Sequence, residues 1–210
     1  MISRRQFGAM AAGVALVSAA EAASAKSDGT KLVKPEMGDD GLYHQPWFLN
    51  SFLVLKDDLG EAAAAGKRFA IIWEQKGCPY CKETHMVNLA NPEINKYIRE
   101  NFDVLQLNMW GSRKVTDFDG KELEERALAR RWGITFTPTI MFLDESVAKV
   151  GNRPGVKGEV ARMPGYFKPF HFINMFQFVR EKAYTKLHFQ KYIQAKAEEM
   201  RKQGKKVTIW

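Results

Sequence analysis

The feature that most constrains the fold of this 210-residue chain is the succession of a strand, a Cys-x-x-Cys and a later Thr-Pro strand. Residues 69–75 are a run of β-forming residues, and Gly-Cys-Pro-Tyr-Cys at 77–81 follows almost directly and opens a predicted helix. Thr-Pro-Thr at 137–139 precedes a second apolar run at 140–143. The two cysteines of the motif are the only ones in the chain. Together these features indicate dithiol–disulfide redox chemistry.

The spacing of Cys78 and Cys81 suits thiol–disulfide exchange. A thiolate carries out the attack on a disulfide, so one sulfur must ionise near neutral pH. At the mouth of a helix, Cys78 faces unpaired N–H groups and the positive end of the helix dipole. Pro79 fits the first turn because the N–H that it lacks would have had no intrahelical partner. We therefore assign Cys78 as the nucleophile and Cys81, one turn further on, as the resolving thiol that forms a disulfide with it.

Three other uses of the cysteine pair are weaker. A structural disulfide that closes so short a loop removes about 2 kcal/mol of unfolded-state entropy, less than a bridge across a longer loop. Covalent haem needs a histidine directly after the second cysteine, where Lys82 stands. A copper or zinc site built from Cys78, Cys81 and His85 stays open as an alternative. No second Cys-x-x-Cys or paired histidines complete such a site, so we expect no metal.

The N-terminus predicts export rather than a folded element. Residues 3–7, Ser-Arg-Arg-Gln-Phe, form a twin-arginine pattern, and a weakly apolar run at 8–20 follows it. That run is too short to span a bilayer. Small-residue cleavage sites end near Ala25, so we expect a signal peptide over residues 1–25. The export route implies a bacterial periplasm, where a two-cysteine protein can work as a disulfide carrier.

Composition predicts one folded domain with a basic tail. The chain is 45% hydrophobic and 12% aromatic, enough for one sizeable core. Residues 26–45 are polar and indicate a linker, 46–184 hold the domain, and 185–210 form a basic helical tail. Much of the net charge of +8 lies from Arg180 onward, where we expect a solvated helix face; the alternatives are an acidic protein partner and the membrane surface. Nucleic acid is not expected as the partner of an exported protein.

The order of the predicted elements indicates a mixed sheet between helices. In chain order we expect a helix at 57–65, a strand at 68–75, helices at 78–89 and 92–101, a strand at 103–110, a polar loop at 111–120, a helix at 121–132, strands at 139–143 and 159–163, and a long helix at 169–184 that continues into the tail. Strands that alternate with helices and end in an antiparallel pair predict an α/β fold with helices on both faces of the sheet.

These segments resemble the thioredoxin superfamily, and most of all the periplasmic thioredoxins of bacterial sulfur-oxidation clusters, the SoxW family. The motifs that carry the resemblance are Gly-Cys-Pro-Tyr-Cys at 77–81, Leu-Asn-Met-Trp-Gly at 107–111, Val-Thr-Asp-Phe-Asp-Gly at 115–120, Thr-Phe-Thr-Pro-Thr at 135–139, and Pro-Gly-Tyr at 164–166 running into Pro-Phe-His at 169–171. They span about residues 57–184. The resemblance implies a thioredoxin-like fold, to which the basic tail adds a C-terminal helical extension.

The resemblance also implies a substrate groove beside the cysteines. Pro138 matches the superfamily proline that has a cis peptide bond, so we expect the Thr137–Pro138 bond to be cis. Such a bond exposes the backbone groups of Thr137, which can pair with an extended substrate strand. Pro164 and Gly165 match the turn that forms part of this groove, and Tyr80 is expected at its lip. The alternatives are an ordinary trans proline and a merely exposed tyrosine.

One departure from the superfamily affects the mechanism. Thioredoxins commonly carry a buried acid six residues before the first cysteine, where this chain has Ile72. Glu74 follows on the same strand face and can substitute as the acid that helps the resolving thiol to lose its proton; the alternative is a solvated residue at the strand end. His85 and His171 are weaker candidates for proton handling, each expected at the surface or in packing.

The function expected from these features is reduction of client disulfides in the periplasm. The segment between Cys81 and Pro138 is too short for the inserted helical domain of DsbA-type oxidases. The resemblance implies a CcdA/DsbD-like membrane electron donor and clients among sulfur-oxidation or cytochrome c proteins. We expect a monomer without a cofactor. A disulfide oxidase or isomerase and a non-catalytic metal-binding module are the alternatives.

Overall fold

The structure, a computed structural model, describes residues 34–204. The predicted signal peptide, with its twin arginines, lies outside the described residues, as does the end of the predicted tail beyond Gly204. Among the residues that are described, none of the helices combines the length and the apolar character needed to cross a bilayer.

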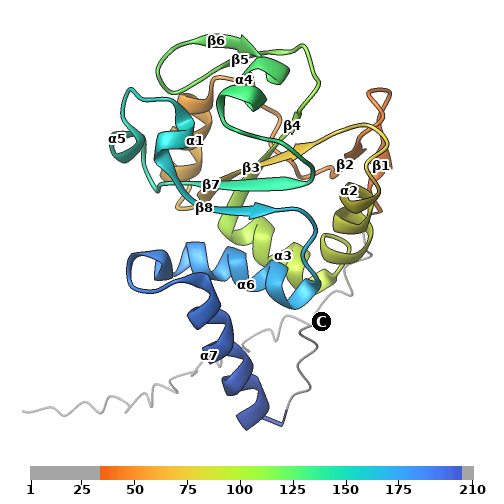
Figure 1. The fold of residues 1–210 in the computed structure, drawn as a ribbon, viewed down its shortest axis with the longest axis vertical. Coiled ribbons are helices and arrows are strands. Elements are labelled where there is room, and N and C mark those ends of the chain that lie inside the picture. Colours follow the sequence, from red (N-terminus) through yellow and green to blue (C-terminus); the bar gives the residue numbers. More distant parts are fainter. Residues whose placement is uncertain (1–33, 205–210) are drawn as a thin grey trace, which may run out of the picture. The chain divides into compact units, whose positions relative to one another are not determined.

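A four-stranded mixed sheet forms the centre of the domain (Figure 1). The strand order is β4 (Phe102–Asn108), β3 (Arg68–Glu74), β7 (Thr139–Leu143) and β8 (Glu159–Pro164). β3 runs parallel to β4, and β7 is antiparallel to both β3 and β8. Every residue of β3 is buried, because the strand has a neighbour on each side and helices above and below it. The predicted mixed sheet, with its antiparallel pair at the end, is confirmed.

Helices cover both faces of this sheet, and the alternation of side chains along β3 gives each face its own core. Phe69, Ile71 and Trp73 point to one face, whereas Ala70 and Ile72 point to the other. The helices of the first face are α1 (Leu55–Ala64), α4 (Glu125–Arg131) and α5 (Val147–Val150). Those of the second are α3 (Pro92–Asn101) and α6 (Pro169–Arg180). The chain therefore has the α/β class that the sequence predicts.

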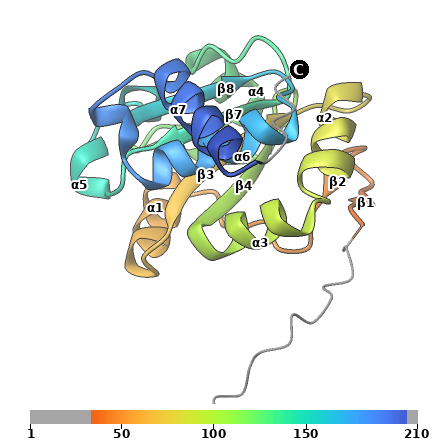
Figure 2. The same cartoon turned by 90° about the horizontal axis from the view of Figure 1, so that it is seen from below.

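Two segments differ from their predicted structure. Residues taken as a polar loop and a helix start hold a small antiparallel pair, β5 (Lys114–Thr116) and β6 (Glu122–Glu124). The long C-terminal helix is interrupted: α6 is followed by the short helix η3 (Ala183–Thr185) and then by α7 (Phe189–Lys202). Lys182 breaks the helix because it adopts a left-handed backbone, with φ 55°. Figure 2 shows α7 lying beside α6.

The segment predicted as a linker contains a hairpin next to the cysteine helix. β1 (Glu36–Met37) pairs antiparallel with β2 (Tyr43–His44), and Figure 2 shows the pair beside α2 (Pro79–Glu83). Leu42 and Gln45 are each only 3% exposed. Gln106 of β4 donates a hydrogen bond to the Tyr43 carbonyl oxygen at 2.7 Å. The linker interpretation therefore does not hold from residue 36 onward, because contacts with distant residues order this segment.

Candidate active site

A sharp strand-to-helix turn presents the cysteine pair. β3 ends at Glu74, and Gly77 has φ 74°, a left-handed conformation that glycine adopts without a steric penalty. Cys78 is the N-cap of α2, and Pro79 occupies the first turn as predicted. The helix then widens into the π-helical turn η1 (Thr84–Asn88).

The two cysteines form a disulfide in the structure, as predicted. Cys78 is 8% exposed and Cys81 3% exposed, so Cys78 is the more accessible of the two. Cys78 Sγ accepts two hydrogen bonds, one from the Cys81 backbone N–H at 3.0 Å and one from the Thr137 hydroxyl at 3.3 Å. After reduction, these two donors stabilise negative charge on the Cys78 sulfur. The geometry therefore suits Cys78 as the nucleophile.

The cis peptide bond lies against this sulfur. The Thr137–Pro138 bond is cis, as predicted, and the Thr137 carbonyl oxygen is 3.5 Å from Cys78 Sγ. Gly165 donates its N–H to the Pro138 carbonyl oxygen at 2.7 Å, and Pro164 pairs with Thr139 across β7 and β8. The turn of Pro164 and Gly165 thus adjoins the cis-proline, where the resemblance places it.

Aromatic side chains lie exposed around the disulfide. Tyr80 is 59% exposed and stacks on Tyr166, with ring centroids 6.3 Å apart. Trp110 and Phe136 are also more than half exposed, and our sequence analysis did not single them out. Trp110 Nε1 donates at 2.6 Å to the side chain of Gln75, a residue in the turn before the cysteines. Both missed residues lie inside the motifs of the resemblance. The available signal was an aromatic residue at the end of a predicted strand, for Trp110, and in a predicted loop, for Phe136.

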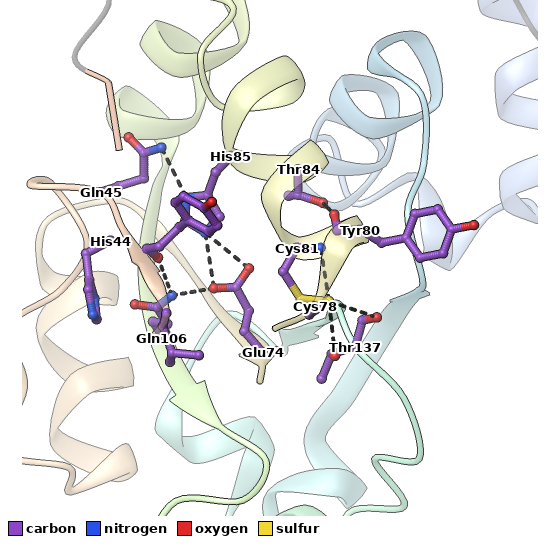
Figure 3. A network of polar contacts seen from close by, with 12 residues as sticks. His44, Gln45, Glu74, Cys78, Tyr80, Cys81, Thr84, His85, Gln106 and Thr137 are labelled. Atoms are coloured by element: carbon purple, nitrogen blue, oxygen red, sulfur yellow. Dashed lines mark hydrogen bonds and ion pairs between the residues drawn. A yellow bond between two sulfur atoms is a disulfide. The ribbon is translucent and has the colours of Figure 1, made fainter. Parts of the chain in front are cut away.

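Glu74 is a buried acid behind the disulfide (Figure 3). It is 1% exposed, so the alternative of a solvated residue at the strand end is wrong. His85 is fully buried, and its Nε2 lies 3.1 Å from both carboxylate oxygens of Glu74. Gln106 donates a second hydrogen bond to this carboxylate, and Gln45 Nε2 lies 3.2 Å from His85 Nδ1. His85 is therefore the buried partner of the acid and not a surface residue.

A cavity joins the acid to the cysteines. Its volume is about 170 Å³, and Glu74, Cys78 and Cys81 line it together with residues of the N-terminal hairpin. The cavity has room for water, which can carry a proton between a thiol and a carboxylate. The arrangement supports Glu74 as the substitute for the acid that is missing at Ile72.

The other histidine and the metal alternative fit this site less well. His171 lies on α6 beside the ring of Phe170, and burial lowers its pKa, which favours the neutral imidazole. Both ring nitrogens of His85 already face Gln45 and Glu74, rather than the cysteines. Within residues 34–204, no three His, Cys, Asp or Glu side chains gather as a possible metal-binding group. The donor set of Cys78, Cys81 and His85 is thus not brought together.

A match to a protein-family model shows which family the chain belongs to. The family model described as "Thioredoxin-like domain" matches residues 55–180. The chain belongs to the thioredoxin-like family. The matched region of this thioredoxin-like protein runs from the start of α1 to the end of α6 and includes the cysteines and the cis-proline. The superfamily part of the resemblance is therefore confirmed.

Several solved structures are similar to part of this chain. A thioredoxin-fold protein from Helicobacter pylori is 23% identical, with a TM-score of 0.48 over 63% of this chain and 86% of that one. A thioredoxin from Thermus thermophilus is also 23% identical, with a TM-score of 0.43 over 56% and 77% of the two chains. The oxidised C-terminal domain of DsbD from Neisseria meningitidis is 17% identical, with a TM-score of 0.40 over 59% and 90%. No curated protein matches the chain.

A thioredoxin-like domain with a disulfide at the start of a helix supports thiol–disulfide oxidoreductase chemistry. The donors around Cys78 and the acid behind Cys81 give the two sulfurs different surroundings. This asymmetry is what a nucleophile and a resolving thiol require.

Proposed function

We propose that this thioredoxin-like protein is an exported thiol–disulfide reductase, similar to the SoxW family. One observation carries the proposal: hydrogen-bond donors converge on Cys78 Sγ, while Cys81 and the buried Glu74 share a cavity. A pair arranged in this way can attack an external disulfide and then release the client.

The reaction proceeds in two displacements. The Cys78 thiolate attacks one sulfur of a client disulfide, forming a mixed disulfide and expelling the other client sulfur as a thiolate. Cys81 then gives its proton, through the cavity, to Glu74 and attacks Cys78 Sγ. The second client thiolate leaves, and the Cys78–Cys81 disulfide forms. Two electrons have then moved to the client, and Glu74 releases the proton to solvent.

The client binds as an extended segment beside the cis-proline. The Thr137 backbone adjoins Cys78 Sγ and offers its N–H and C=O to a client strand. Pro164 and Gly165 form one side of this groove, and the exposed ring of Tyr80 contacts the client at its lip. Backbone pairing of this kind orients a client disulfide without requiring a particular side-chain sequence.

The cellular setting follows from the N-terminal motif and from the resemblance. The twin-arginine pattern supports export to the periplasm and removal of residues 1–25. A CcdA/DsbD-like membrane protein would return electrons to the disulfide, and the clients would be sulfur-oxidation or cytochrome c proteins. The chain would act as a monomer. It would need no cofactor, because its own sulfurs carry the electrons.

Insulin reduction in the presence of a dithiol tests the activity. We expect the native protein to accelerate precipitation of the insulin B chain, and Cys78→Ser to abolish this acceleration. Cys81→Ser should instead retain a mixed disulfide with the client, which mass spectrometry detects. A reduction potential near that of thioredoxin, roughly −270 mV, supports a reductase, whereas one near −120 mV would assign an oxidant. Absence of any insulin reduction would contradict the proposal.

A further inference from the structure

We propose that His85 takes up a proton when the Cys78–Cys81 disulfide is reduced and gives it up when the disulfide forms again. This deepens the proposed function, on which it rests. His85 then acts as a positioning residue for Glu74, because an imidazolium opposite the carboxylate keeps it ionised and ready to accept the Cys81 proton.

Glu74 and His85 are both buried, so water does not screen a charge on His85. Glu74 is 1% exposed and His85 0%, and their side chains are in hydrogen-bond contact. In Figure 3, Glu74 lies between His85 and the disulfide. Reduction places a thiolate on Cys78, beside a cavity that already holds the Glu74 carboxylate. Two negative charges near each other in a buried site favour uptake of a compensating proton nearby.

The disulfide form shows hydrogen bonding suited to a neutral His85. Gln45 Nε2 donates to Nδ1 at 3.2 Å, so Nδ1 is an acceptor and the ring proton is on Nε2, facing Glu74. An imidazolium needs an acceptor at both nitrogens. A half-turn of the Gln45 amide supplies one, because it brings Oε1 to the position that Nε2 now occupies.

Apart from its contact with His85, no described hydrogen bond holds the Gln45 amide in its present orientation. Its Oε1 is buried and has no hydrogen-bond partner among the described residues, so only His85 determines which end of the amide faces the ring. Gln106 differs, because its Nε2 donates both to the Tyr43 carbonyl oxygen and to Glu74. The network therefore has one fixed amide and one that can follow the protonation of His85.

The remaining titratable groups around the pair do not offer the same response. They are Tyr43, whose ring centroid is 6.0 Å from that of His85, the Asp40–His44 ion pair on the same hairpin, Lys82 on α2, and two exposed cations, Lys76 beside Gly41 and Arg113, which donates to the Gln106 carbonyl oxygen. Lys82 is exposed, and Asp40 and His44 are each more than 40% exposed. Solvent screens these charges, so the fully buried histidine is the group that responds to a charge on Cys78.

The electron and proton balance makes the proposal measurable. In the proposed reaction, the disulfide takes two electrons from a dithiol reductant and two protons, to give the Cys78 thiolate, the Cys81 thiol and the His85 imidazolium. Without His85, only the Cys81 proton is taken up. One proton per two electrons changes the potential by about 30 mV for each tenfold change in proton concentration. The two cases therefore differ by about 30 mV per pH unit.

The experiment measures the reduction potential against a dithiol buffer over about pH 6 to 8, the range in which histidine titrates. We expect the slope of the native protein to be steeper than that of His85→Gln by about 30 mV per pH unit. Gln45→Leu, which keeps the Glu74–His85 contact but removes the acceptor for Nδ1–H, should also give the shallower slope. His188→Gln is the matched control, because His188 is an exposed histidine at the start of α7, and it should keep the native slope.

A measurement on the native protein avoids any effect of the substitutions on folding. The ¹⁵N shift of His85 Nδ1 should change from an unprotonated to a protonated nitrogen when the disulfide is reduced at about pH 7. Equal slopes in the native protein and His85→Gln, or an Nδ1 shift that does not respond to reduction, would overturn the role of His85 and leave the reductase intact. Failure of the cysteine pair to exchange with the dithiol would overturn both.

Discussion

Two buried carboxylates, one on each side of the sheet, illustrate different uses of buried charge. Asp117 adjoins the core beneath α1 and α4 and accepts hydrogen bonds from Arg131 and Trp132 side chains and from the N–H groups of Phe118 and Gly155. Glu74, on the other face, has the side chains of Gln106 and His85 as its partners and borders a cavity. Both are about 1% exposed.

The difference lies in what surrounds each charge. Asp117 has several donors of fixed position, including an arginine that stays protonated, so its network has a single arrangement and holds the fold. Glu74 has a histidine as partner, and beyond that histidine lies Gln45, whose Oε1 has no hydrogen-bond partner among the described residues. A fully satisfied network rigidifies the structure, whereas a network with a titratable member can change its protonation with the redox state.

Among the substitutions that test this comparison, Asp117→Ala should have the largest effect. We expect a loss of about 3 kcal/mol in the free energy of unfolding, because Arg131 and Trp132 lose a buried acceptor. Urea denaturation measures this loss. Asp119→Ala is the control, since Asp119 pairs with the same arginine from a more exposed position and should cost under about 1 kcal/mol. Equal costs for the two variants would show that burial of Asp117 does not matter.

Glu74→Gln should leave the fold in place and slow the chemistry. The amide still accepts from His85, but it cannot accept the proton of Cys81. We expect the attack of Cys81 on the mixed disulfide to slow about a hundredfold, as for the loss of a general base. Single-turnover release of a labelled client measures this step. Glu83→Gln, an exposed change on α2, is the control, and matching rates for the two variants would contradict the role of Glu74.

Asp58 tests the number of donors that a buried carboxylate needs. Only the Ser51 hydroxyl donates to it among the described side chains, and burial raises the pKa of Asp58 to about 6. The native state therefore binds this proton more tightly than the unfolded chain, so the free energy of unfolding should fall as the pH rises from about 4 to 6. Asp58→Asn should remove that fall in urea denaturation. Asp57→Asn, an exposed neighbour whose charge is the smallest cause of the raised pKa of Asp58, should keep most of it. An unchanged pH dependence in Asp58→Asn would contradict the assignment.

The smallest effect is expected at the rim of the site. Tyr80→Ala removes an exposed ring that stacks on Tyr166 and contacts the client in the proposed complex. We expect KM for insulin to rise about three- to tenfold with kcat unchanged, in keeping with the strength of one aromatic contact. Phe52→Ala, another exposed ring, is the control and should leave KM unchanged. A fall in kcat instead would mean that Tyr80 affects the sulfur chemistry.

The features that could be predicted from the sequence are local ones. Cys78 as an N-cap with Pro79 behind it, and the alternation of apolar residues in β3, depend on neighbours within a few positions. The hairpin at 36–44 was missed because its short strands carry little periodicity. Gln45, which directly follows this hairpin and is buried, contacts His85, 40 positions away, and no pattern within the segment signals that contact.

The sequence by itself determined the reactive pair, through residues a few positions apart, and the class of fold, through the order of its elements. The cis-proline was expected because its motif resembles that of the thioredoxin superfamily. The tertiary structure alone decided the environment of Glu74: a carboxylate at the end of a strand can be solvated or buried. Its surroundings come from β2, β4 and η1, which meet only in the folded domain. Burial and hydrogen-bond partners set the energy of a charge, and both are properties of the assembled fold.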